Sequence, residues 1–190
     1  MIRWGRLAGA YAALAAVALG LVWARGGSPL MHPEPRWALP PLLAHAYSLA
    51  FGVAFAIVIV LGSRFSVQRY AWARRLHAEL RPFAQGLSGT GLVVLAALSS
   101  IGEELLFRSL LQPWMGLWPQ ALVFGLVHQL PGPSRWVWAS WAFVVGLVFG
   151  VMFEQTGSIL GPLSAHALVN AINLDYLKRH DPGPHAAWVA

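Results

Sequence analysis

Long apolar runs separated by short polar connections dominate the chain. A membrane-spanning helix needs roughly 20 consecutive apolar residues, and two runs nearly free of charge, Leu7 to Ala24 and Pro41 to Gly62, meet that requirement. After a basic stretch, the further apolar segments are 91–111, 119–130, 136–153 and 159–177. The pattern predicts an all-α fold, a polytopic membrane bundle of about six helices, in which 119–130 is a short or re-entrant helix.

The composition supports a location in lipid. Hydrophobic residues make up 57% of the 190 residues and charged residues only 11%, whereas an ordinary soluble domain has about 25% charged residues. We expect a single integral membrane domain over residues 1–190, because no part of the chain is polar enough for a separate soluble unit. The formal charge of +6 does not predict nucleic-acid binding, since the cations lie between apolar runs.

The distribution of cations predicts the orientation of the bundle. With a cytoplasmic amino terminus, ten of the thirteen Lys and Arg residues fall on the cytoplasmic side, and the opposite side receives only Arg25 and Arg36. The ten are Arg3, Arg6, Arg64, Arg69, Arg74, Arg75, Arg81, Arg135, Lys178 and Arg179. Both termini are therefore expected to be cytoplasmic, and the short hydrophobic chain fits a prokaryotic inner membrane.

Two segments permit a second interpretation. The first apolar run ends in Val22-Trp23-Ala24, a plausible signal-peptidase site, but the run is longer than the roughly 7 to 15 residues of a signal h-region, so a retained span is preferred. The basic stretch 63–85 alternates Arg with aromatic and Leu residues. It is either an interfacial amphipathic helix that meets anionic lipid head groups or an ordinary cytoplasmic loop.

Ionisable residues inside the later spans are the main functional signal, because such residues are costly in a bilayer and mark functional sites by default. Each of three segments carries a polar pair or an aromatic–polar pair four residues apart, which places its members on one helix face. The pairs are Glu104 with Arg108, Phe124 with His128, and His166 with Asn170, and Glu103 precedes the first of them.

The depths of these residues predict one shared site. If Gln112 to Trp118 form the turn between two helices, Glu103 and His128 lie about 12 and 14 Å from it, and His166 can reach a similar depth on the last helix. A short or broken helix in a membrane borders either protein or a wet cavity, and a wet cavity is what hydrolysis requires. The motif-bearing core extends over about 91–177.

The two neighbouring carboxylates are expected to have different roles. Glu104 can pair with Arg108 along one helix face, while Glu103 points about 100° away and remains available as a general base near a histidine. A buried ion network without chemistry, and histidines that are only hydrogen-bonded in the core, are the alternatives.

The three motifs together resemble the CPBP or Abi family of intramembrane proteases, which includes type II CAAX prenyl endopeptidases and bacteriocin-processing enzymes. The family pattern Glu-Glu-x-x-x-Arg, Phe-x-x-x-His and His-x-x-x-Asn is intact and in order at 103–108, 124–128 and 166–170. The resemblance covers less than half of the chain. It implies an endopeptidase that hydrolyses a peptide bond of a membrane-associated protein or peptide.

For the site, the resemblance implies that Glu103 and His128 activate water, and that His166 and Asn170 stabilise the oxyanion; Glu104, Arg108 and Phe124 support them. The family has been described both as glutamic-type and as metalloproteases. There is no His-Glu-x-x-His helix, yet Glu103, His128 and His166 could supply the three ligands of a catalytic zinc. The metal-free, glutamic mechanism without a cofactor is favoured.

Other functions stay open at this stage. Gly86 to Gly89 read Gly-Leu-Ser-Gly, as in rhomboid proteases, but a helix-start role for Ser88 is preferred because a serine mechanism would leave the buried acidic and basic residues unused. A non-catalytic scaffold or transporter subunit could use the polar pairs as interhelical contacts. The sequence names neither the substrate nor an oligomeric state.

Overall fold

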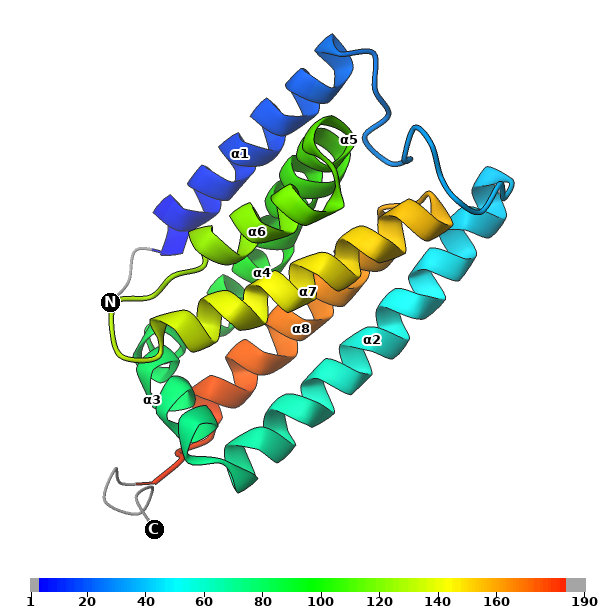
Figure 1. Cartoon of the computed structure of the whole chain (residues 1–190). Helices are drawn as coiled ribbons and strands as arrows, with labels where there is room; N and C mark the ends of the chain where they lie inside the picture. Colours follow the sequence, from blue (N-terminus) through cyan, green and yellow to red (C-terminus); the bar gives the residue numbers. More distant parts are fainter. Residues whose placement is uncertain (1–3, 184–190) are drawn as a thin grey trace.

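The computed structural model describes residues 4–183, which fold into a helical bundle (Figure 1). Its elements are α1 (Trp4–Ala24), α2 (Pro41–Arg69), α3 (Ala71–Gln85), α4 (Gly89–Glu104), the π-helical segment η1 (Leu105–Leu111), α5 (Gln112–Met115), α6 (Leu117–Val127), α7 (Arg135–Thr156) and α8 (Leu160–Arg179). The prediction of an all-α membrane bundle is confirmed. Arg3 and the two chain ends, on which part of the predicted orientation depends, lie outside the described residues.

Four helical rods in the described part of the chain are long and apolar enough to cross a membrane: α1, α2, α7 and the continuous rod from α4 through α5. α6 is the short helix that the sequence predicted. Its 11 residues rise only about 16 Å, so it ends within the thickness of the bundle. α2 is longer than predicted, because the helix continues past Gly62 to Arg69.

The helices run alternately up and down (Figure 1). We call one end of the bundle the basic end. It contains the carboxyl end of α2, all of α3, the start of α7 and the carboxyl end of α8. There Arg81 on α3 donates to the carbonyl oxygen of His180 at 3.0 Å, and Ser134 donates to Glu79 at 2.9 Å. The basic stretch 63–85 is therefore divided between the last turns of α2 and the separate helix α3.

α8 is the central helix, packed against α2, α3, α4 and α7. Its closest approach is to α2, where a side chain at Gly52 would overlap the backbone of Gly161. Ser48 adds polar contacts at the same level, since its hydroxyl donates to the carbonyl oxygen of Ser158 at 2.7 Å and accepts from the Gly161 amide at 2.8 Å. Small residues and interhelical hydrogen bonds of this kind replace the hydrophobic effect as the packing force between helices in lipid.

α1 runs parallel to α4 and packs closely on it. Trp4 lies against Gly91 at one end of the contact, and the carbonyl oxygen of Tyr11 lies against Gly102 further along. The first apolar run thus packs as one layer of the bundle.

Candidate active site

Three helices bring the sequence-predicted polar residues together inside the bundle. Glu103 and Glu104 end α4, His128 follows the last residue of α6, and His166 lies in the first half of α8. Glu103, Glu104 and His166 are buried, and His128 is the most exposed of the four, with 20% of its side-chain surface accessible. The predicted convergence at one depth is therefore what the structure shows.

Glu104 connects a cation to a histidine. One carboxylate oxygen lies 3.1 Å from Nε of Arg108, and the other lies 2.7 Å from Nδ1 of His166. Because a carboxylate paired with an arginine accepts hydrogen bonds, Nδ1 of His166 is the donor in this contact. This contact fixes the orientation of the ring and directs its Nε2 atom toward Glu103.

Arg108 is fully buried, and its surroundings satisfy only part of its hydrogen-bonding capacity. One guanidinium nitrogen donates to the carbonyl oxygen of Gly146 at 3.1 Å. The guanidinium carbon lies 4.6 Å from the ring centre of Phe124 and 5.3 Å from that of Phe149. Aromatic faces attract a desolvated cation, so these rings and Glu104 together hold a charge that the membrane interior would otherwise exclude.

The backbone changes from α-helix to π-helix directly after the two glutamates. At the end of this segment the amide of Gln112 donates to the carbonyl oxygen of Phe107, five residues earlier. A π-turn is rare and often occurs at functional sites. Here it lies between Glu104 and the end of the rod, and it includes Arg108.

Glu103 faces both imidazole rings. Its Oε2 atom lies 3.4 Å from Nε2 of His128 and 3.8 Å from Nε2 of His166. Nδ1 of His128 lies 2.7 Å from the carbonyl oxygen of Phe124 and donates to it, because a carbonyl oxygen can only accept. Two ring nitrogens are thus directed at one carboxylate oxygen, and a water molecule between these groups would be polarised by all three.

The position of His128 depends on where α6 stops. The chain after Val127 reads His-Gln-Leu-Pro-Gly-Pro, and prolines at 131 and 133 cannot continue a helix. His128 therefore lies at an open helix end, beside the loop 129–134, and is partly accessible. This loop leads to the basic end, where Ser134 contacts Glu79.

Phe124 and Asn170 have different surroundings from each other. The Phe124 ring packs against His128 and Phe107, with ring centres 4.4 and 4.9 Å apart, in addition to Arg108. Asn170 lies one turn after His166, and its side-chain amide donates to the hydroxyl of Ser99 at 3.2 Å. The structure therefore brings Phe124 into the centre of the site and places Asn170 beside it, against α4.

Tyr11 is a site residue that the sequence reasoning missed. Its hydroxyl forms a side-chain hydrogen bond with Glu103, so α1 contributes a donor to the proposed base. A single Tyr in an apolar run is ordinary, and no spacing rule relates it to a residue more than ninety positions away. The residues around Tyr11 in the sequence therefore did not predict this contact.

Ser88 lies far from the imidazole rings and has a structural role. Its side chain accepts from the amide of Gly91 at 2.9 Å and caps the first turn of α4. Glu103 follows fifteen residues later, about 22 Å along the helix. The geometry thus favours the helix-start role for Ser88 over a serine nucleophile paired with His166.

A metal ion at this site would need ligand atoms from the carboxylate and imidazole groups of the cluster. Within residues 4–183, no group of three or more His, Asp or Glu side chains has the arrangement of a metal site. Tetrahedral zinc would hold each ligand atom at about 2.0 to 2.2 Å, and Glu103, His128 and His166 are the side chains that would supply those atoms. The Nδ1 atoms of the two histidines are already held, that of His128 by the Phe124 carbonyl oxygen and that of His166 by Glu104.

Comparison with known proteins identifies the segment that carries the site. Residues 86–172 match the family described as type II CAAX prenyl endopeptidase Rce1-like. The uncharacterized protein YpbD of Bacillus subtilis (strain 168) is 32% identical over 81 residues, which cover 43% of this chain and 42% of that protein. The aligned part is thus less than half of either chain, and no solved structure shows significant similarity. The segment that matches this family model contains the glutamates, both histidines and Asn170.

Proposed function

We propose that this protein is an intramembrane endopeptidase that cleaves a membrane-associated protein or peptide. The observation that carries the proposal is the position of Glu103, whose Oε2 atom faces the Nε2 atoms of two oriented histidines. Each histidine is held through its other nitrogen, as a catalytic imidazole must be. Residues 86–172 match a family described as an endopeptidase, which supports peptide-bond hydrolysis as the reaction.

In the mechanism that we propose, water between Glu103 and His128 attacks the carbonyl carbon of the scissile bond. Glu103 accepts a proton from the water as the new carbon–oxygen bond forms, and the carbonyl oxygen becomes an oxyanion. The proton then passes to the leaving nitrogen as the carbon–nitrogen bond breaks, which yields a carboxylate and an amine. Glu103 is thus returned to its starting form.

His166 and Asn170 are the proposed donors to the oxyanion. Glu104 accepts from Nδ1 of His166, and a buried carboxylate in this position stabilises the imidazolium form, as in hydrolase triads. The protonated Nε2 could then donate to the oxyanion, while Asn170 offers a second N–H from the next turn. Glu104 and Arg108 are positioning residues in this scheme, and Phe124 holds the carbonyl oxygen that orients His128.

The first prediction concerns the base. Glu103→Gln keeps the size of the side chain but removes its ability to accept a proton, so cleavage of a membrane substrate should fall about 10²- to 10⁴-fold. Ser88→Ala, which removes only a helix cap, is the matched control and should retain near wild-type turnover. The measurement is single-turnover cleavage by protein reconstituted in bilayers. Unchanged cleavage by the Gln variant would favour a scaffold or transporter role, and a selective loss with Ser88→Ala would restore the serine mechanism.

The second prediction concerns Tyr11. Tyr11→Phe removes one hydrogen bond to a charged group, which is worth about 1.5 to 3 kcal/mol, so kcat/KM should fall roughly ten- to hundredfold. Because the lost donor favours the ionised carboxylate, the acidic limb of the pH–rate profile should also move to higher pH. Tyr47→Phe, on the exposed face of α2, is the control. A lower rate with an unmoved pH profile would show that Tyr11 only packs α1 against α4.

The third prediction separates the glutamic mechanism from a zinc-dependent one. We expect activity to resist strong chelators and the purified protein to contain far less than one zinc per chain. Zinc held by Glu103, His128 and His166 would instead be removed by chelation and restored by added metal, because its ligands release and take up protons with the ion. Elemental analysis together with activity before and after chelation distinguishes the two, and recovery on zinc addition would overturn the metal-free mechanism.

We also propose that the basic end faces the cytoplasm. The predicted turn at 112–118 would then lie on the opposite side of the membrane. The accessible side chain of His128 beside the loop 129–134 favours an opening of the site toward the basic end. A prokaryotic inner membrane remains the proposed location.

The fourth prediction tests this orientation. The chain has no Cys, so single cysteines can be introduced at Trp114, Arg69 and Gln129 and treated with a membrane-impermeant thiol reagent in intact cells. Trp114→Cys should react, whereas the other two should react only after the membrane is permeabilised. Labelling of Gln129→Cys in intact cells, with Arg69→Cys still protected, would place the opening on the outer side.

A further inference from the structure

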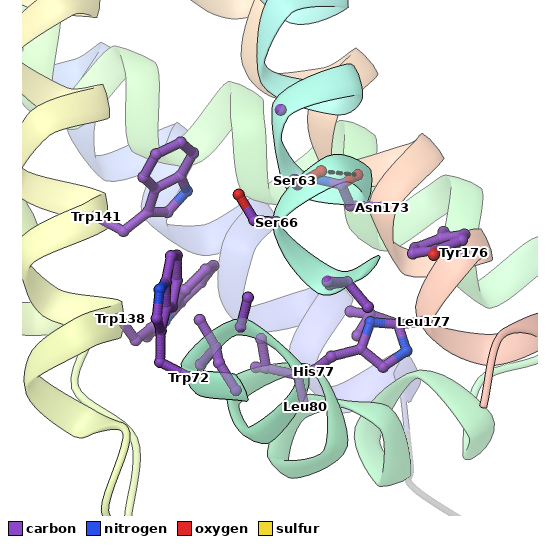
Figure 2. Close-up of a pocket in the computed structure, with 14 residues that line it drawn as sticks. Ser63, Ser66, Trp72, His77, Leu80, Trp138, Trp141, Asn173, Tyr176 and Leu177 are labelled. Carbon is purple, nitrogen blue, oxygen red and sulfur yellow. Dashed lines mark hydrogen bonds between the residues drawn. The ribbon is translucent and has the colours of Figure 1, made fainter. Parts of the chain in front are cut away.

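A cavity lies at the basic end, where α3 closes the space between α2, α7 and α8 (Figure 2). Its volume is about 140 Å³. Most of the wall is apolar, with Trp72, Trp138 and Trp141 on one side and Leu177 on another (Figure 2). None of the residues that line it belongs to the proposed catalytic set.

The buried part of this cavity carries little charge. Its polar lining side chains are Ser63, Ser66, Asn173, Tyr176 and His77. Burial lowers the pKa of His77, whose Nε2 atom lies 3.0 Å from the carbonyl oxygen of His180. The interior therefore suits an apolar occupant rather than an ionic one.

Two arginines without a carboxylate partner among the described residues are sequence neighbours of lining residues: Arg64 follows Ser63, and Arg74 follows Ala73. Arg64 lies over the Tyr176 ring at 5.0 Å, and Arg74 donates to the carbonyl oxygen of Gln68 at 3.2 Å. Among residues 4–183, the ion pairs involve other arginines. The Nε atoms of both Arg64 and Arg74 are buried without a hydrogen-bond partner, so neither guanidinium has a full set of acceptors.

The level of the cavity in the bundle matches the boundary between head groups and acyl chains. Gly62 lies seven residues before the end of α2, about 10 Å into the helix, whereas α3 lies across the end as an amphipathic helix with cations and exposed Trp72. Cations attract anionic lipid phosphates at such a surface, and Trp residues mark the same boundary.

We propose that this cavity binds an anionic phospholipid, with one acyl chain between α2 and α7 and the phosphate at Arg64 and Arg74. An uncharged interior near two arginines without carboxylate partners is complementary to a molecule that is apolar along most of its length and anionic at one end. A zwitterionic lipid offers the same chain but a weaker net attraction to the two arginines.

The cavity also touches the candidate active site through Trp138. This side chain lines the cavity, and its ring centre lies 6.3 Å from that of His128. A bound chain would contact Trp138, and through it could affect His128. This step rests on the proposed function: turnover should be higher in bilayers that contain the anionic lipid.

The fifth prediction measures binding, without relying on catalysis. Protein is reconstituted in bilayers of phosphatidylglycerol and phosphatidylcholine, extracted into detergent, and the retained lipid is identified by native mass spectrometry. Wild type should retain phosphatidylglycerol several-fold over phosphatidylcholine. The double variant Arg64→Gln/Arg74→Gln should lose that preference, whereas Arg69→Gln/Arg75→Gln, at exposed positions on the same two helices, should keep it. Equal retention of both lipids by wild type would overturn the proposal.

A filled cavity provides the second test. A side chain at Gly62, which lines the cavity, meets no atom within 4 Å, so Gly62→Phe should occupy the space and reduce retention of both lipids. Gly20→Phe, at an equally open position on α1, is the control. Wild-type retention by Gly62→Phe would contradict the proposal. If that variant instead raised KM for a peptide substrate while lipid retention stayed unchanged, the cavity would belong to the substrate.

Discussion

A buried ion pair is the constraint on which the rest of this bundle depends. Glu104 and Arg108 have no accessible side-chain surface, in a chain that is built for lipid. Removing one partner of such a pair leaves an uncompensated charge, which costs about 3 to 5 kcal/mol. The pair can persist because the Gly146 carbonyl oxygen, two Phe rings and His166 surround it. Those groups belong to α6, α7 and α8, so solvating one pair fixes the positions of these three helices against the rod of α4 and η1.

The same pair separates the roles of two adjacent carboxylates. Glu104 is used on both oxygens, by Arg108 and by His166. Glu103 contacts groups at the edge of the cluster and keeps some access to solvent. Neighbouring positions on a helix point in different directions, so one sequence step is enough to place a fixed anion beside an available one.

The features predicted correctly from the sequence were those that depend on local spacing. Apolar length identified the spans, and a separation of four residues put Glu104 beside Arg108, because that distance is fixed within one helix. The π-turn, the Tyr11–Glu103 contact and the Asn170–Ser99 hydrogen bond depend on how separate helices pack, which no spacing specifies. The end of α2 was placed too early, since long Arg side chains let a helix continue past the apolar core while the charges reach the interface.

Glycines supply the remaining part of the explanation. A side chain at Gly146 would collide with Phe124, and one at Gly125 would collide with Phe143, so these positions set the depth at which α6 rests on α7. The close approach also exposes the carbonyl oxygens of Gly146 and Gly150, which accept from Arg108 and Gln112. Shifting α6 by one turn would move His128 about 5.4 Å along the bundle, beyond contact with Glu103. In this fold the smallest residues therefore determine whether the carboxylate and the imidazole meet.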